Sequence, residues 1–481
     1  MNRLSAMRRL LLLAAMMEAA YLVFLVIPFP LLRYYDTPLL DLGKLTGHAP
    51  WLATAVVMAV MFFLYMAAYR TQGDPQLGRL VVVLGIVLVV TLMLVYPIGA
   101  LDIFDYAFYG REMAVYKANP YLVVPNDFSS DPFLPYMGWK SLPFTYGPLW
   151  AVLSWGLGRI GGNSLLANLL VYKVVVAAAY ALSAGLIYVV LRREMPQRTL
   201  AGTVLFAWNP LVVFEVGANG HNDILLVLFL VIGVVAWTRQ RKAVAIGSVA
   251  LSVLTKFVTA PLGLVWLVAG LRSSADWRRR ALFVLASVLV VAGLTAAVYW
   301  PFVHDQTNVK TVLLAPLRRQ ELFTSSFPAL LVFATADRLG RSTAETLARN
   351  LALAGLLTFT VYQAWRVRSG WQDVARTSYN VLLFYLLFSC LWFQPWYIMW
   401  IVPLAALLPA GREAMTAMLF SLSAMAKYLV FDFFWYWNPD LLTTPRIETL
   451  AVVVIYMLPL AYVLLSVLQQ QWSNTSSPPR R

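Results

Sequence analysis

Long apolar runs alternate with short polar segments along most of this chain. A helix of about 20 apolar residues spans the hydrocarbon core of a bilayer, so each run predicts a transmembrane helix. The runs lack the residue-by-residue alternation of a membrane β-barrel strand, so we predict an all-α polytopic membrane protein. The predicted spans lie near residues 10–29, 51–69, 80–98, 166–190, 199–216, 222–237, 243–270, 281–300, 346–365, 379–393, 396–410, 413–431 and 447–468.

Two apolar segments, 148–162 and 243–270, can each be threaded in two ways. If the first crosses the membrane and the second is one span, the basic loops 192–198 and 239–242 fall outside. If the first stays outside and the second is a hairpin of two short helices, both loops are cytoplasmic, as the positive-inside rule requires. We therefore predict the second arrangement, with about 14 helices, cytoplasmic termini and Lys256 near the outer apex of the hairpin.

The segment after the third span is long and rich in Pro, Tyr, Phe and Asp, which is typical of a functional loop rather than a linker. The expected parts are the N-terminal transmembrane helices 1–98, the external catalytic loop 99–163 with juxtamembrane amphipathic helices, the transmembrane core 164–300, the external loop 301–345, the C-terminal transmembrane helices 346–468 and the cytoplasmic tail 469–481.

Composition narrows the class of protein. Of the residues, 61% are hydrophobic and 12% are charged, which excludes a soluble globular protein of this size. The net charge of +15 would suggest a nucleic-acid partner in a soluble domain. Here the basic residues gather in short loops, so we expect the lipid bilayer as partner and no nucleic acid. The single cysteine, Cys390, cannot form an internal disulfide.

The stretch "LDIFDYAFYGREM" places acids directly after an apolar run. Asp102, Asp105, Tyr109 and Glu112 follow one another at spacings of 3, 4 and 3 residues, which puts them on one face of a helix. Carboxylates at a membrane boundary are costly unless they have a partner or a function. We therefore predict a juxtamembrane helix whose acidic stripe faces an external cavity, with an ordinary solvated helix face as the alternative.

Other polar groups are predicted on the same side of the membrane. The turn "GANGHND" joins two apolar spans, Lys256 of "LTKF" stands alone in a long uncharged stretch, and "WFQPWYIMW" lies at a predicted boundary. Each has a plain alternative: a hydrogen-bonded turn, a snorkelling lysine, and interfacial aromatic residues. The candidate side chains are Asn219, His221, Asn222, Asp223, Lys256, Arg318, Arg319, Gln394, Trp396 and Tyr397.

Acids beside cations at a membrane surface suit the transfer of a sugar from a lipid phosphate. A lysine or arginine stabilises the departing phosphate, and a carboxylate takes the proton of the attacking hydroxyl. Direct displacement of this kind inverts the anomeric carbon. An ion-coupled secondary transporter is one alternative, although its site would lie near the midplane. A lipid-linked polysaccharide ligase or polymerase is another.

In chain order, "DIFDYAFYGREMAVYKANPY", "YGPLW", "WNP", "GHND", "LTKF" and "QPWY" resemble motifs of the GT-C superfamily of integral-membrane glycosyltransferases. Within that superfamily the chain is most similar to bacterial polyprenol-phosphate-mannose-dependent mannosyltransferases. The resemblance implies a GT-C-like fold, a polyprenyl-phosphate sugar donor, a glycolipid or glycan acceptor, and an active site on the outer face of a bacterial-type plasma membrane. Mannose as the sugar rests on this resemblance alone.

The resemblance also implies roles for residues. The catalytic aspartate of the first external loop corresponds to Asp102 or Asp105, with Asp102 slightly preferred because it is nearer the membrane edge. Lys256 matches the position that holds the donor phosphate. No cofactor is expected, and a divalent metal is not favoured because the chain lacks a DxD triplet at the site. The remaining expected contacts are Arg111 and Arg319 to the donor phosphate or lipid, and Tyr109, Asn219, His221, Asn222, Asp223, Gln394, Trp396 and Tyr397 to substrate.

Overall fold

A computed structural model describes residues 3–47, 50–303, 309–315, 322–408, 411–437, 440 and 443–476. Within these ranges all named elements are helices, and the only β-type pairings are two isolated bridges. Arg318 and Arg319 lie outside the described residues.

Residues up to the middle of the chain form the first helices. Their bounds are α1 (Arg3–Tyr21), η1 (Leu22–Val26), α2 (Leu31–Tyr34), α3 (Leu42–Thr46), α4 (Trp51–Tyr69), α5 (Leu77–Leu92), α6 (Asp102–Ala114), η2 (Pro125–Phe128), η3 (Leu134–Tyr136), α7 (Pro148–Gly161), α8 (Leu165–Glu194), η4 (Pro196–Arg198), α9 (Thr199–Ala207), α10 (Pro210–Gly217) and α11 (Asp223–Thr238). The π-helical turn η1 continues α1 without a break.

The later helices complete the bundle. Their bounds are α12 (Lys242–Thr255), η5 (Phe257–Thr259), α13 (Ala260–Leu271), α14 (Trp277–Val303), α15 (Val309–Leu314), α16 (Phe327–Leu339), α17 (Arg341–Arg366), α18 (Trp371–Phe384), η7 (Tyr385–Ser389), η8 (Pro395–Trp400), α19 (Val402–Leu407), α20 (Arg412–Tyr428), η9 (Leu429–Trp435) and α21 (Thr444–Ser476).

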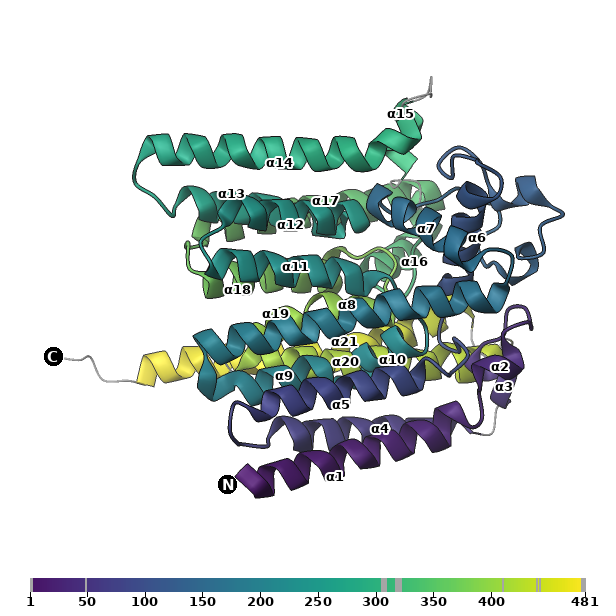
Figure 1. The fold of residues 1–481 in the computed structure, drawn as a ribbon, viewed down its shortest axis with the longest axis horizontal. Coiled ribbons are helices and arrows are strands. Elements are labelled where there is room, and N and C mark those ends of the chain that lie inside the picture. The colour runs from purple at the N-terminus through teal and green to yellow at the C-terminus, as the bar shows by residue number, and fades with distance from the viewer. Residues whose placement is uncertain are drawn as a thin grey trace.

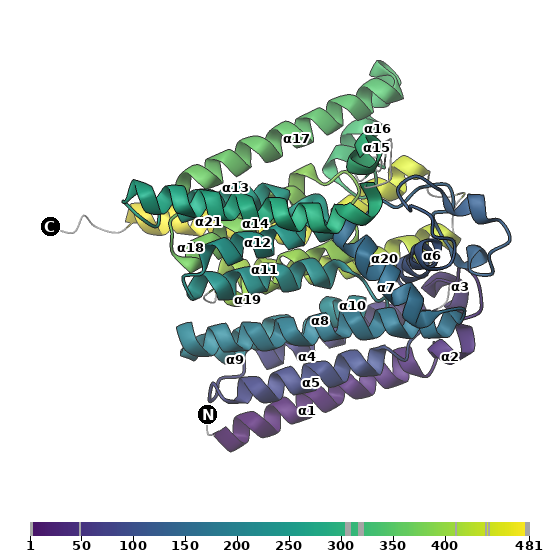
Figure 2. The same ribbon diagram turned by 45° about the horizontal axis from the view of Figure 1, so that its top comes forward.

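The long helices lie side by side with nearly parallel axes (Figure 1). Both chain ends lie at one end of this bundle, and α2, α3, α6 and α7 lie at the opposite end. The same layering is visible after a turn, with α16 and α17 at one edge (Figure 2). Most buried apolar residues belong to one continuous core that runs through the bundle. Helix α6, which carries Asp102 and Asp105, thus lies at the opposite end of the bundle from the basic loops 192–198, 239–242 and 272–280.

Six described helices are long and apolar enough to cross a membrane, and α9 with α10 makes a seventh if this pair, bent by 46°, counts as one span. Five further apolar helices are shorter, with 10 to 17 residues. The chain is thus a polytopic helical membrane protein, as predicted. The larger number of about 14 membrane helices stays a prediction.

The stretch 243–270 folds as a hairpin. The start of α12 and the end of α13 line one surface cleft with the start of α14, so both arms return to the same end of the bundle. Helix α12 stops where Lys256 adopts an extended backbone, and Pro261 lies in the first turn of α13. Proline suits the first turn of a helix because its missing N–H has no helical partner there. Lys256 therefore lies at the apex of the hairpin.

Helix α7 packs against α6 and α8 at the loop end of the bundle, so the segment 148–162 does not run the length of the bundle. Close packing with α6 depends on glycine: a Cβ on Gly110 would lie 2.6 Å from the Ser154 carbonyl oxygen. Helix α6 differs from its prediction. Instead of lying amphipathically at an interface, it is buried on every side from Ile103 to Met113, because the loop that follows folds over it.

Candidate active site

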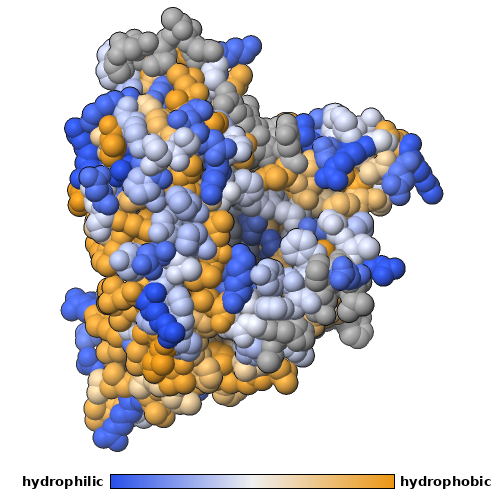
Figure 3. Space-filling model, turned by 90° about the vertical axis from the view of Figure 1, so that its right-hand side faces the viewer, coloured by the Kyte–Doolittle hydropathy of each residue, from blue (hydrophilic) through white to orange (hydrophobic). Residues whose placement is uncertain are grey.

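A cavity of about 410 Å³ lies at the loop end of the bundle, next to the apex of the α12–α13 hairpin. A view onto this end shows a recess near its middle with hydrophilic side chains in and around it (Figure 3). The cavity is lined by Asp102, Thr145, Tyr146, Lys256, Phe257, Val258, Pro261, Leu322, Leu353, Leu356, Tyr385, Leu391, Trp392, Trp396, Tyr397 and Trp400. Four separate motifs of the sequence, those that carry Asp102, Tyr146, Lys256 and Trp396, thus supply residues to one cavity.

Asp102 and Lys256 meet in this cavity through Tyr146. The Tyr146 hydroxyl donates a hydrogen bond of 2.9 Å to Asp102 Oδ1. Lys256 Nζ lies 6.0 Å from the centre of the Tyr146 ring. Tyr146 thus lies next to both side chains, and the structure brings the half-buried Asp102 and Lys256 into one cavity.

Gly147 explains how Tyr146 reaches the hairpin. The Gly147 amide donates to the Thr255 carbonyl oxygen at 3.1 Å. A Cβ at this position would lie only 2.1 Å from the Leu254 carbonyl oxygen, so no larger residue fits without moving the backbone. The "YGPLW" segment is thereby tied directly to the helix end that carries Lys256.

Lys256 is held by a buried acid. Its Nζ lies 2.7 Å from Asp223 Oδ1, and Trp400 Nε1 donates to the same oxygen at 2.6 Å. The Asp223 side chain is fully buried, whereas the Lys256 side chain keeps 19% of its surface exposed. The ammonium group also lies 4.8 Å from the Tyr397 ring centre and 5.4 Å from that of Trp400, distances typical of cation–π contact. Lys256 is thus fixed in the cavity wall by Asp223 and by two aromatic rings.

The other polar residues of the "GANGHND" turn, Asn219, His221 and Asn222, do not line the cavity. Gly220 has a φ of +72°, a conformation that favours glycine, and the turn folds back so that Asn219 donates to Glu215 Oε2 at 2.7 Å. His221 stacks on Trp396 with ring centres 4.0 Å apart. Asn222 accepts a hydrogen bond of 3.2 Å from the Tyr106 hydroxyl.

Burial decides the ionisation state of His221. It lowers the pKa of the imidazole to about 3, so the ring is neutral near pH 7. Nε2 lies 3.3 Å from Glu215 Oε2 without the alignment of a hydrogen bond, and Nδ1 has no hydrogen-bond partner among the described residues. His221 thus cannot supply a second positive charge beside Lys256, and its visible role is to support Trp396.

Aromatic rings form the far wall of the cavity. Tyr397 and Trp400 stack with centres 4.4 Å apart, and Trp396 meets Tyr397 edge to face. Such ring faces suit the apolar faces of sugars as well as a lysine cation. Gln394 does not line the cavity. Its Oε1 accepts a hydrogen bond of 3.0 Å from Lys427. The same lysine donates to the carbonyl oxygen of Phe393, the residue before Gln394.

Of the acidic stripe on α6, only Asp102 lines the cavity. Asp105 Oδ1 accepts hydrogen bonds from the backbone amides of Gly138 at 2.9 Å and Trp139 at 3.5 Å. Tyr109 donates to the Leu142 carbonyl oxygen. Asp105 and Tyr109 therefore face the covering loop and bind its backbone.

Arg111 is bound within the same loop. It lies 2.6 Å from Asp131, donates to Asn163 at 2.7 Å, and sits over the Phe133 ring. It is buried and does not line the cavity. The structure thus gives Arg111 a local partner for its charge, outside the cavity that Asp102 and Lys256 line.

Glu112 is fully buried, and neither carboxylate oxygen has a hydrogen-bond partner among the described residues. Burial, with the nearby charges of Asp127 and Asp131, raises the pKa of Glu112 to about 9. The group is therefore neutral near pH 7. No three side chains of His, Cys, Asp or Glu come together as metal ligands in the described part of the chain.

Some site residues were not singled out from the sequence. Tyr146 and Trp400 lie in quoted motifs, but only the fold shows that their polar atoms meet Asp102 and Asp223. Glu215 was missed entirely, although a lone acid in the apolar run "PLVVFEVG" is an unusual and costly feature. The Tyr428 hydroxyl donates to Glu215 at 2.7 Å.

The fold is that of an integral-membrane helical protein with a cavity lined by Asp102, Lys256 and aromatic rings at one end. The family model for alpha-(1->6)-mannopyranosyltransferases, N-terminal domain, matches residues 34–304, which is more than half of the chain. The chain therefore belongs to this family and is a mannosyltransferase-type glycosyltransferase, as the motif resemblance indicated. Among proteins with curated functions, none matches the chain. The matched range contains Asp102, Tyr146, Asp223 and Lys256.

Proposed function

We propose that this protein transfers mannose from a polyprenyl-phosphate donor to a glycolipid or glycan acceptor on the outer face of the membrane. The observation that carries the proposal is the shared cavity of Asp102 and Lys256. Family membership supports the mannosyl group, and the cavity supports the lipid-phosphate donor because its cation lies beside apolar lining residues such as Val258 and Leu353.

In this mechanism Lys256 binds the donor phosphate and stabilises the negative charge that grows on it as the glycosidic bond breaks. Asp102 takes the proton from the acceptor hydroxyl as that oxygen attacks the anomeric carbon. The bond to the acceptor forms on the face opposite the departing phosphate, so the configuration inverts. Asp223 and Trp400 act through Lys256 by fixing its position.

The orientation in the membrane is part of the proposal. The basic loops at 192–198, 239–242 and 272–280 lie at the end of the bundle that carries both chain ends, opposite Asp102. The positive-inside rule then favours a cytoplasmic location for the basic end and an external one for the cavity. A plasma membrane of bacterial type fits a polyprenyl-phosphate donor.

The test is transfer by the purified full-length protein in proteoliposomes. We expect radiolabelled mannose to pass from polyprenyl-phosphate mannose, and not from a nucleotide sugar, to octyl α-mannopyranoside. Nuclear magnetic resonance of the product should show the anomeric configuration opposite to that of the donor. Transfer from GDP-mannose alone, or retention of configuration, would refute the proposed donor or mechanism.

A further inference from the structure

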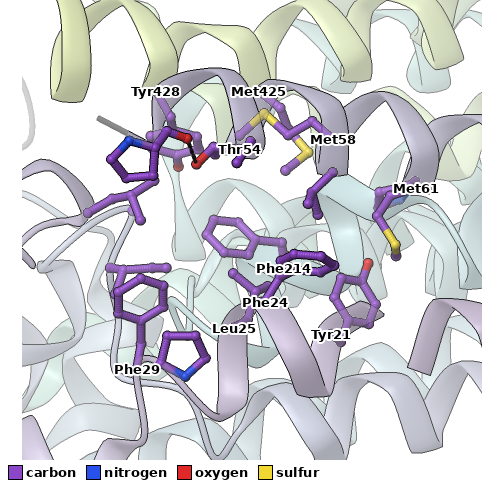
Figure 4. A pocket seen from close by; sticks show the side chains of 18 of the residues that line it. Tyr21, Phe24, Leu25, Phe29, Thr54, Met58, Met61, Phe214, Met425 and Tyr428 are labelled. Atoms are coloured by element: carbon purple, nitrogen blue, oxygen red, sulfur yellow. Dashed lines mark hydrogen bonds between the residues drawn. The ribbon is translucent and has the colours of Figure 1, made fainter. Parts of the chain in front are cut away.

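A second cavity, of about 270 Å³, is lined in part by α10 and shares no lining residue with the active-site cavity. Its walls are almost wholly apolar, and Phe24, Phe29, Phe214, Met58 and Met425 surround it (Figure 4). An apolar cavity of about 150 Å³ stays dry and binds benzene, so this one has room for a longer hydrocarbon. Nothing in the transfer chemistry described above uses it.

The cavity lies between two helices that are long and apolar enough to cross a membrane, α1 with η1 on one side and α4 on the other. At its edge Phe24 keeps 47% of its surface exposed, and Ala53 is also exposed. The opening therefore faces the surface that the bilayer would cover, and a lipid chain could enter sideways.

The inner end of the cavity touches the polar layer behind the active site. Tyr428 lines the cavity and donates its hydroxyl to Glu215, while the Gly99 amide donates to Asn219 at 3.1 Å. Gly99 lines this cavity and Asp102, three residues on, lines the active-site cavity. One short segment of chain, from Gly99 to Asp102, thus contributes to the walls of both cavities.

We propose that this cavity holds a hydrocarbon chain of the lipid that anchors the acceptor sugar. The assignment rests on the proposed function. The donor chain already has apolar lining around Lys256, at Val258 and Leu356, whereas the second cavity has no cation for a phosphate among its lining residues. A lipid seated here would carry its sugar headgroup at the level of Gly99, beside Asp102.

The test compares two acceptors of the same sugar, octyl and methyl α-mannopyranoside, with the full-length protein in proteoliposomes. The measured quantity is the ratio of kcat/KM for the octyl acceptor to that for the methyl acceptor. Each buried methylene contributes about fourfold, so blocking the cavity with Val57→Trp should lower this ratio by at least about tenfold. Ala53→Phe, which fills the opening without entering the packed core, should act in the same direction.

Val56→Trp is the matched control. Val56 is adjacent in sequence on α4 but is 53% exposed and does not line the cavity, so this variant should keep the wild-type ratio. An unchanged ratio in both cavity variants would overturn the inference. An equal fall in Val56→Trp would overturn it as well, because the effect would then come from any large aromatic side chain on α4 and not from filling the cavity. Failure of the proposed function is separate: Asp102→Asn would then retain transfer to both acceptors.

Discussion

Replacing Asp102 by Asn tests the proposed catalytic role of this residue separately from its hydrogen bond to Tyr146. The Asn side chain has the same shape, and its oxygen can still accept the hydrogen bond of 2.9 Å from Tyr146. A hydrogen bond to a neutral amide oxygen is weaker than one to a carboxylate, so the substitution should lower the free energy of unfolding by about 1 kcal/mol. An amide cannot accept the proton of the acceptor hydroxyl, and loss of a general base lowers kcat by about 10²- to 10⁴-fold, or about 3 to 5 kcal/mol of barrier.

Asp105→Asn should give the opposite pattern. This carboxylate is buried and accepts hydrogen bonds from the Gly138 and Trp139 amides. Hydrogen bonds to a charged acceptor contribute about 1.5 to 3 kcal/mol each, so the neutral amide should weaken the loop's attachment and lower the melting temperature. Because Asp105 does not line the cavity, kcat should fall much less than in Asp102→Asn.

The assay is mannose transfer in proteoliposomes alongside thermal unfolding of the same preparations. We expect Asp102→Asn to melt within a few degrees of wild type with kcat reduced at least about 100-fold. The reverse ranking, with Asp105→Asn inactive at normal stability, would assign the base to Asp105. Near-normal kcat in both variants would refute a catalytic aspartate on α6.

The remaining predictions concern charge and orientation. Lys256→Gln should lower kcat/KM for the lipid-linked donor, because the proposed phosphate-binding charge is removed. It should also lower the melting temperature, because the fully buried Asp223 loses its cationic partner. Normal kinetics would contradict a phosphate-binding lysine. Glu112→Gln should gain stability over wild type as pH rises from about 5 to 9, since the native carboxyl keeps a proton that the unfolded chain releases; a constant difference in melting temperature would argue against the raised pKa. With Cys390 replaced by Ser, Val258→Cys should react with an impermeant maleimide on intact cells, and Gln240→Cys only after permeabilisation; the reverse would invert the proposed orientation.

Much of the fold was predictable because it depends on local patterns. Apolar runs predicted the helices, and the parity of basic loops correctly predicted that 243–270 is a hairpin. Lys256 could be singled out from the sequence because it is a lone charged residue in an uncharged stretch. A lysine in such surroundings needs a partner, and in the structure that partner is Asp223.

The face of α6 was harder to predict. Helical spacing placed Asp102, Asp105 and Glu112 on one side but could not show what would cover that side. The covering loop, with Gly138 at its contact to Asp105, is a tertiary feature that leaves no periodic pattern. The meeting of Trp400 with Asp223 likewise joins parts of the chain 177 residues apart, which one sequence does not reveal.

The central claim is that one cavity holds the donor phosphate beside the catalytic carboxylate. Cryo-electron microscopy of the Asp102→Asn protein with bound polyprenyl phosphate tests it most directly. We predict phosphate density within about 4 Å of Lys256 Nζ, an ion-pair distance, with the prenyl chain leaving along Val258 and Leu356. Phosphate density at the basic end near Gln240, or in the apolar cavity beside Phe214, would contradict the account.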